Sequence, residues 1–297
     1  MSRRDVEFNA DGVTLRGWFY KPKGLKGKAP CVVLSHGFSG VKEMSLDKTA
    51  EVFAEAGLCV LVYDNRNLGA SGGKPRSEID PSWQRRDYRT AISYAQTLRE
   101  VDPARIGIWG TSYTGGTVCA VAAIDKRVKC VVSQVPFMRA HHNLQQFLPI
   151  GAVKGFQQML DDDRMRRLSG KPSMYMKICS DDPNEPVVFP GTETFNFMQN
   201  YTGDPKCTWQ NKVTLRSIDF MLEYDVMGYM EYISPTPLLM IVSEYDTTTP
   251  TDIALSCFDK VQGPKKLHVI KAGHYAAYIE KHAEASGAAR DWFVQHL

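Results

Sequence analysis

Short apolar runs alternate with amphipathic stretches along the first half of the chain. Strands are predicted at residues 31–35, 59–63, 106–109 and 128–133, and the continuous apolar run at 31–35 is expected to be buried on both faces. Helices are predicted between them, at residues 45–55, 82–98 and 117–124. Because parallel strands need crossover connections, this alternation predicts an α/β fold with a mostly parallel central sheet and helices on both faces.

The two ends of the chain extend the same pattern. Residues 6–9 and 14–20 alternate in polarity around an Ala-Asp-Gly turn and predict a β-hairpin. Apolar strands return at residues 238–243 and 267–270, and residues 288–296 predict an amphipathic helix. The sheet is therefore expected to draw strands from both ends of the chain.

The middle of the chain breaks the alternation. Between residues 136 and 232, helix-like segments mix with Pro- and Gly-rich loops, and this segment holds nine of the twelve methionines. We therefore expect a core of residues 1–135 and 233–297 with a mainly helical cap inserted at residues 136–232. Methionine is flexible and polarisable, so such a cap suits a plastic apolar pocket, although each methionine taken singly fits a packed core better.

Composition and charge narrow the function classes. A hydrophobic content of 43% and a charged content of 23% are ordinary for a globular protein. A net charge of +3 gives no basis for expecting nucleic acid or a membrane surface as a partner. Neither a secretory leader nor a membrane-spanning run is visible, so a cytoplasmic protein is expected. The seven scattered cysteines fit buried, reduced thiols, with a single disulfide as the alternative.

One strand-to-turn motif predicts acyl-transfer chemistry. The strand at 106–109 runs into residues 110–116, Gly-Thr-Ser-Tyr-Thr-Gly-Gly. Gly110 avoids a Cβ clash in the turn, so Ser112 would present its hydroxyl at the tip, beside the free N–H groups of a helix N-terminus. The usual pattern is G-x-S-x-G, whereas Thr114 occupies the fifth position here and must find room.

A nucleophilic serine needs a base, and the base needs an acid that orients it. In this architecture the acid follows the serine in sequence and lies on a loop after a strand. Asp246 meets both conditions, directly after the strand at 238–243. Glu244 and Asp252 are its rivals, and Asp252 is better suited to the first turn of the next helix. Thr249 and Pro250 fit the N-cap and first residue of that helix.

The expected base is His274, which follows the strand at 267–270. It comes after the acid with room for one helix, one strand and a loop, as the order Ser, Asp, His requires. Gly273 would supply a sharp turn before it.

The loop after the strand at 31–35 is the fourth element. Its Ser-His-Gly-Phe sequence leaves backbone N–H groups free to face a carbonyl oxygen. We expect the N–H groups of Phe38 and Tyr113 to form an oxyanion hole, in which each donor is typically worth about a hundred- to a thousandfold in rate. His36 would brace this loop. His36, Phe137 and Met138 are expected to line the substrate pocket.

Metal and nucleotide sites are not indicated. No His, Cys or carboxylate cluster has metal-ligand spacing, and the Gly-rich residues 69–75 lack the P-loop pattern. The expected chemistry needs no cofactor and no metal.

Together these residues resemble the α/β-hydrolase superfamily over essentially the whole chain outside the cap. The loop at 35–38, the turn at Ser112, Asp246 and His274 match the family's oxyanion loop, nucleophile, acid and base, and residues 63–73 are similar to a loop that buttresses the elbow. The Gly-Thr-Ser-Tyr elbow and the pair at 87–88 resemble the dienelactone-hydrolase-like and X-Pro-peptidase/cocaine-esterase-like branches. The combination is similar to fungal polyketide transferases and thiohydrolases.

The resemblance implies an enzyme that moves a small, largely apolar, polyketide-like acyl group from an ester or thioester to water or an alcohol through Ser112. The thioester could be free or held on a carrier. Phe38 stands where cocaine-esterase-like members carry a tyrosine, so only backbone donors remain. Two alternatives stay open: non-hydrolytic catalysis with His274 as base, and a ligand receptor with little turnover. Apolar cap surface would suit a homodimer or a carrier-protein contact.

Overall fold

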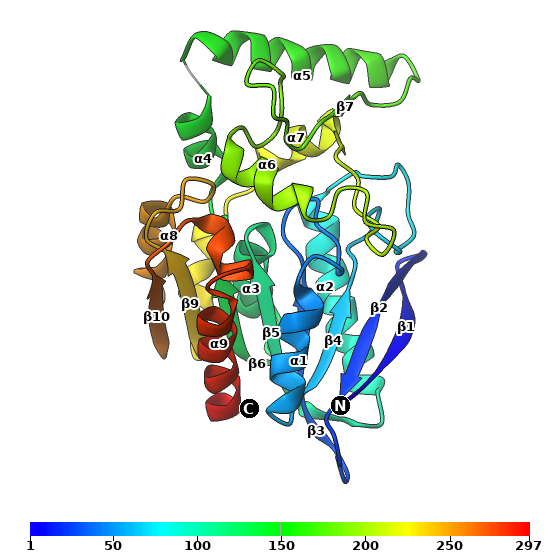
Figure 1. The fold of residues 1–297 in the computed structure, drawn as a ribbon, viewed down its shortest axis with the longest axis vertical. Helices are drawn as coiled ribbons and strands as arrows, with labels where there is room; N and C mark the ends of the chain where they lie inside the picture. The colour runs from blue at the N-terminus through cyan, green and yellow to red at the C-terminus, as the bar shows by residue number, and fades with distance from the viewer. Residues whose placement is uncertain (149) are drawn as a thin grey trace.

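The computed structural model describes residues 1–148 and 150–297; Pro149, inside the expected cap, lies outside the described residues. An eight-stranded sheet runs through the molecule in the order β1-β2-β4-β3-β5-β6-β9-β10 (Figure 1). Its strands are β1 (Ser2–Ala10), β2 (Val13–Lys21), β3 (Ala29–Ser35), β4 (Cys59–Tyr63), β5 (Val101–Thr111), β6 (Val128–Gln134), β9 (Leu238–Ser243) and β10 (Lys265–Ile270). The predicted mostly parallel sheet and the N-terminal hairpin are confirmed.

Only the hairpin edge of the sheet is antiparallel. β1 pairs with β2 and β2 with β4 in antiparallel fashion, and every later neighbour pair is parallel. β3 and β5 are in register with Ser35 opposite Gly110, so the loops that follow these two strands start at the same level. The carboxyl ends of the parallel strands therefore share one edge of the sheet, where ligands bind in open α/β sheets.

Helices cover both faces of the sheet, each over its own hydrophobic core. One face packs against α1 (Leu46–Glu55) and α9 (His282–His296). The other packs against α2 (Pro81–Thr97), α3 (Tyr113–Ile124) and α8 (Thr251–Phe258). The structure thus has the layered arrangement that the alternating pattern predicts.

Three helix boundaries differ from the sequence prediction. α3 begins at Tyr113, four residues earlier than expected, because its first turn, Tyr-Thr-Gly-Gly, carries no helical periodicity. α9 begins at His282, since Ala285 and Ser286 are buried by tertiary packing although Gly287 reads locally as a helix breaker. α8 begins at Thr251, so Thr249 is not its N-cap.

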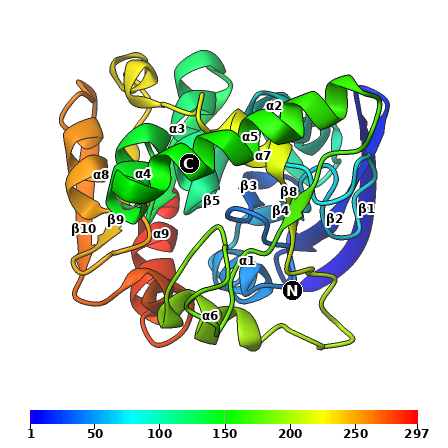
Figure 2. The same ribbon diagram turned by 90° about the horizontal axis from the view of Figure 1, so that it is seen from above.

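The segment between β6 and β9 adds no strand to the large sheet. Its described elements are α4 (Ala140–Phe147), η1 (Ile150–Ala152), α5 (Val153–Leu168), β7 (Tyr175–Met176), α6 (Thr192–Gln199), β8 (Val213–Thr214), α7 (Leu215–Met221) and η2 (Met227–Tyr232). From above, α4, α5 and α7 cross the molecule over the strand ends, and α6 runs along one edge (Figure 2). We propose the same division into core and cap for this reason.

Two further features concern compartment and chemistry. Across the described ranges, no helix combines the length and the apolar character needed to cross a membrane. The seven cysteines are free thiols, and six of them are buried.

Candidate active site

Ser112 lies in a strained turn between β5 and α3. Its backbone has φ 53° and ψ −122°, a conformation that L-residues rarely adopt and that costs on the order of 1–3 kcal/mol. Three hydrogen bonds hold the turn: the Ser112 N–H donates to the Gln134 carbonyl at 2.9 Å, and the Ser112 carbonyl accepts from Gly115 at 2.9 Å and Phe137 at 2.8 Å. The half-buried side chain is thereby presented at the strand end, as the motif predicts.

Thr114 fits beside this turn because of a hydrogen bond and the glycines around it. Its buried hydroxyl donates to the carbonyl of His36, which ties α3 to the loop after β3. A Cβ on Gly110 would come within 2.3 Å of the Thr114 carbonyl oxygen, and one on Gly116 within 2.1 Å of the Phe137 carbonyl oxygen. The close packing that the missing glycine usually permits is therefore provided by neighbouring positions.

Asp246 and His274 form a buried pair after β9 and β10. The His274 Nδ1 lies 2.7 Å from Asp246 Oδ2, and both side chains are almost fully buried. The other carboxylate oxygen accepts the N–H groups of Thr248 at 2.9 Å and Thr249 at 2.6 Å. These donors fix the carboxylate in the plane that faces the histidine.

Thr249 has a role in this pair that the sequence did not indicate. Its hydroxyl lies 2.9 Å from Asp246 Oδ2, 3.1 Å from His274 Nδ1 and 3.0 Å from the carbonyl oxygen of Val135. The residue expected to cap α8 thus contacts both members of the acid–base pair. The local sequence carries no signal for this, because Thr before Pro fits a helix start equally well.

Gly273 is required for a different reason from the one expected. Its φ of −81° and ψ of −176° are extended backbone that any residue adopts, so no sharp turn depends on it. A Cβ there would instead come within 2.5 Å of a carboxylate oxygen of Glu193, on α6 of the cap. The same oxygen accepts the Tyr275 N–H at 3.3 Å. Glu193 therefore links the cap to the loop that carries His274.

The two residues expected to supply oxyanion donors, Phe38 and Tyr113, line a cavity together with Ser112. Within residues 1–148 and 150–297, neither the Phe38 N–H nor the Tyr113 N–H is hydrogen-bonded to a protein acceptor. Gly37 brings the first loop close, since a Cβ on it would lie 3.0 Å from the Ser112 Cβ. The two donors named from the sequence are therefore available near the serine.

His36 braces this loop. Its Nε2 accepts the Asn65 N–H at 3.1 Å, so the neutral ring carries its proton on Nδ1, 2.9 Å from the Gly37 carbonyl oxygen. Burial lowers the pKa of His36 below its ordinary value of 6.5, which agrees with this neutral form. Asp64, also from the segment at 63–73, accepts the Lys42 backbone N–H at 2.7 Å. That segment therefore supports the loop after β3 through these contacts.

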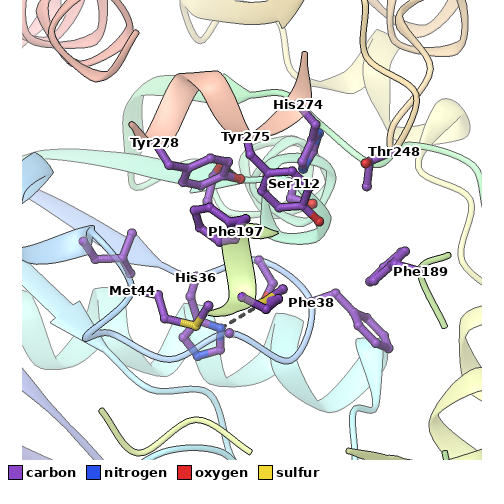
Figure 3. A pocket seen from close by; sticks show the side chains of 15 residues that line it. His36, Phe38, Met44, Ser112, Phe189, Phe197, Thr248, His274, Tyr275 and Tyr278 are labelled. Atoms are coloured by element: carbon purple, nitrogen blue, oxygen red, sulfur yellow. Dashed lines mark hydrogen bonds between the residues drawn. The ribbon is translucent and has the colours of Figure 1, made fainter. Parts of the chain in front are cut away.

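Two cavities meet at Ser112. The first lies on the side of the acid–base pair and is lined by Ser112, Thr111, His274, Thr248, Tyr275, Tyr278, His36, Gly37, Phe38, Gly40, Met44, Leu46, Phe189, Phe197 and Met198. Figure 3 shows Ser112 and His274 on one side of it and His36, Phe38 and Met44 across from them. Burial raises the pKa of Tyr275 and of Tyr278 well above the ordinary value, so both phenols stay neutral.

The second cavity lies under α4, α5 and α7 and is mostly apolar. It shares Ser112, Phe38 and Phe189 with the first and is otherwise lined by Tyr113, Phe137, Ala140, Asn143, Leu144, Phe156, Val188, Ile218, Met221, Leu222 and Thr249. His36 and Phe137, both expected at the pocket, each line one of the two cavities. Met138 does not: it is fully buried in the core and is not among the described residues that line either cavity.

The described part of the chain contains no group of three or more His, Cys, Asp or Glu side chains that could hold a metal ion. The arrangement that it does contain, a serine in a strained turn, a buried His–Asp pair and two free N–H groups, can support nucleophilic attack on a carbonyl.

Comparison with known proteins agrees with this arrangement. A family model described as alpha/beta hydrolase fold matches residues 30–281. A thiohydrolase from Eupenicillium brefeldianum is 33% identical over 279 residues, covering 92% of this chain and 87% of that protein. Polyketide transferase grgF from a Penicillium species is 32% identical over 276 residues, covering 92% and 90%.

A crystal structure of alpha/beta hydrolase GrgF from Penicillium sp. sh18 has a similar fold. It matches with a TM-score of 0.85 at 28% identity, over 100% of this chain and 99% of that chain. These similarities support hydrolysis or transfer of an acyl group in general.

Proposed function

Because the chain belongs to the α/β-hydrolase fold family, we propose that it is a serine-dependent hydrolase or acyltransferase with Ser112, Asp246 and His274 as its triad. The observation that supports this most directly is the buried 2.7 Å contact between His274 and Asp246, with Ser112 and His274 lining one cavity. The relatives named above support acyl chemistry, and the serine mechanism is our inference from the residues.

The reaction proceeds in two halves. The Ser112 oxygen attacks the acyl carbonyl carbon while His274 takes the hydroxyl proton, and Asp246 stabilises the imidazolium that forms. The bond to the alcohol or thiol breaks, and His274 returns the proton to that leaving group. In the second half His274 takes a proton from water or an alcohol, whose oxygen attacks the acyl-serine and restores the free Ser112 hydroxyl.

The developing oxyanion is bound by the N–H groups of Phe38 and Tyr113. Tyr113 is the first residue of α3, and Phe38 lies in a loop that His36 braces, so both N–H groups are positioned before substrate binds. Each is worth about a hundred- to a thousandfold in rate. The phenylalanine side chain at position 38 offers no hydroxyl, and the hole relies on backbone donors alone.

We propose a small, largely apolar, polyketide-like acyl group as substrate, delivered as an ester or as a thioester that is free or held on a carrier. The apolar lining of the second cavity and the names of the relatives support this class. Whether water or an alcohol is the acceptor is set by which of them reaches His274.

The test is intact-protein mass spectrometry after incubation with acyl thioesters of graded chain length. The wild type should gain the mass of the acyl group and release thiol, and Ser112→Ala should do neither. Ser256→Ala, on α8 outside both cavities, is the matched control and should behave as wild type.

The same experiment separates the alternatives. Turnover without any acyl adduct, persisting in Ser112→Ala but lost in His274→Ala, would replace this proposal by base catalysis without an acyl-enzyme. An adduct that persists in Ser112→Ala would place the acyl group on another residue. Added alcohols then distinguish transfer from hydrolysis by the product that forms.

A further inference from the structure

Because two cavities meet at Ser112, the acyl chain can be placed in one of them and the leaving group in the other. His274 must protonate the leaving group and deprotonate the acceptor, so both have to lie in the first cavity, which His274 lines. His274 is not among the described residues that line the second cavity. The acyl chain therefore occupies the second cavity, under α4 and α7. This step depends on the function proposed above.

One buried amide stands out in the wall of this acyl cavity. Ala140, Asn143 and Leu144 line it from one face of α4, as their spacing along the helix requires. Asn143 is only 2% exposed, and its Nδ2 donates to the Thr248 carbonyl at 3.0 Å, which fixes the orientation of the amide. The Oδ1 accepts no hydrogen bond from any described residue.

Each of the other polar side chains of the cavity is either engaged or sealed. The Thr249 hydroxyl contacts Asp246 and His274, and Ser112 is the proposed nucleophile. The Tyr113 hydroxyl is sealed from the open space. The Asn143 oxygen is not among the sealed, unpartnered side-chain atoms of the described residues. It is thus an acceptor held in a fixed position within an apolar wall.

We propose that Asn143 is a specificity-determining residue that accepts a hydrogen bond from a hydroxyl group on the acyl chain. A buried acceptor in apolar surroundings favours a ligand that brings a donor to it, because an unmatched acceptor loses its hydration without compensation. The substrate class is then a mostly apolar acyl group that carries one hydroxyl along its chain. A keto group at the same place would be disfavoured, since two acceptors would face each other.

The structural alternative is that Asn143 only anchors α4 to the loop of Asp246. The two roles use different atoms: the anchor uses Nδ2, and recognition uses Oδ1. Asn143→Leu removes both. Asn143→Asp keeps an oxygen acceptor and removes the donor to Thr248. Met221→Leu reshapes the same cavity without changing its polarity and serves as the matched control.

The experiment measures kcat/KM by thiol release for N-acetylcysteamine thioesters of octanoate and of a series with one hydroxyl at successive carbons. The wild type should prefer at least one hydroxylated isomer over octanoate by about three- to tenfold, the range of one neutral hydrogen bond. Asn143→Leu should lose that preference, while Asn143→Asp and Met221→Leu retain it.

The outcomes separate this inference from the proposed function. Equal losses on all thioesters in Asn143→Leu and Asn143→Asp, with the hydroxyl preference unchanged, would show an anchor only and overturn the inference. A wild type that turns over octanoate and all isomers alike would also overturn it. If no thioester gives thiol release above the Ser112→Ala background, the proposed function itself fails. Guanidinium unfolding of each variant identifies any that do not fold, and the preference is then judged on the folded one.

Discussion

Replacing Thr114 by glycine restores the G-x-S-x-G pattern, and we expect the restored pattern to destabilise this protein. The Thr114 side chain is almost fully buried, and its hydroxyl donates to the His36 carbonyl. The substitution removes both this hydrogen bond and a buried methyl group. The space that the family glycine usually opens is already provided here by Gly115 and Gly116, so nothing offsets the loss.

The magnitude follows from the groups that are lost. A net hydrogen bond contributes about 0.5–1.5 kcal/mol, and a buried methyl about 0.8 kcal/mol before any cavity term. Glycine in the first turn of α3 adds a backbone-entropy cost of up to about 1 kcal/mol. We expect Thr114→Gly to lower the free energy of unfolding by about 2–3 kcal/mol.

Guanidinium unfolding with linear extrapolation measures this loss of stability. Two further variants separate the contribution of the hydroxyl from that of the methyl group. Thr114→Ser keeps the hydroxyl and should lose less than about 1 kcal/mol. Thr114→Val keeps the shape but leaves the His36 carbonyl without its donor, at a cost of about 1–3 kcal/mol. Because that carbonyl belongs to the oxyanion loop, Val and Gly should also lower kcat/KM more than Ser does. A Gly variant as stable as wild type, or Val and Ser variants of equal stability, would refute the reasoning.

Three further predictions concern the same edge of the sheet. Thr249→Val removes the hydroxyl beside Asp246 and should lower kcat/KM by about ten- to a hundredfold, the range of one hydrogen bond to a charged group. Gly273→Ala brings a Cβ against the Glu193 carboxylate and should lower kcat, and adding Glu193→Ala should restore it. His36 has a lowered pKa, so the unfolded state binds its proton first; stability should fall as pH drops below about 6.5, by at most about 1.4 kcal/mol per pH unit.

Each of these has a matched comparison. Thr249→Ser should keep kcat/KM near the wild-type value. Equal losses of kcat/KM in the Ser and Val variants would show that the hydroxyl is not the cause. Non-restoration of activity in the double variant would show that the cost of Gly273→Ala does not come from Glu193. For His36, the pH dependence of unfolding in wild type is compared with that in His36→Gln, and identical slopes between pH 7 and 5 would exclude the histidine as their source.

Family membership and the sheet were predictable because both depend on local patterns read in chain order. The apolar runs at 59–63 and 238–243 predicted both ends of β4 and β9 correctly. Strands buried on both faces are apolar throughout, so the end of the run marks the end of the strand. Helix starts were less predictable. The first turn of α3 contains Gly115 and Gly116, and that of α9 contains the exposed Ala283 and Glu284, so neither turn carries an apolar helical period.

Which loops meet follows from the order of strands along the chain: parallel strands put their carboxyl ends on one edge, so the loops of Ser112, Asp246 and His274 gather there. How that edge is completed depends on contacts that form only in the folded molecule. Three features depend on packing between segments far apart in the chain. The Thr249 hydroxyl contacts the pair of Asp246 and His274, and Glu193 occupies the space that a side chain at position 273 would need. Met138 packs in the core rather than at a cavity. Such contacts are set by three-dimensional shape, which no local periodicity encodes.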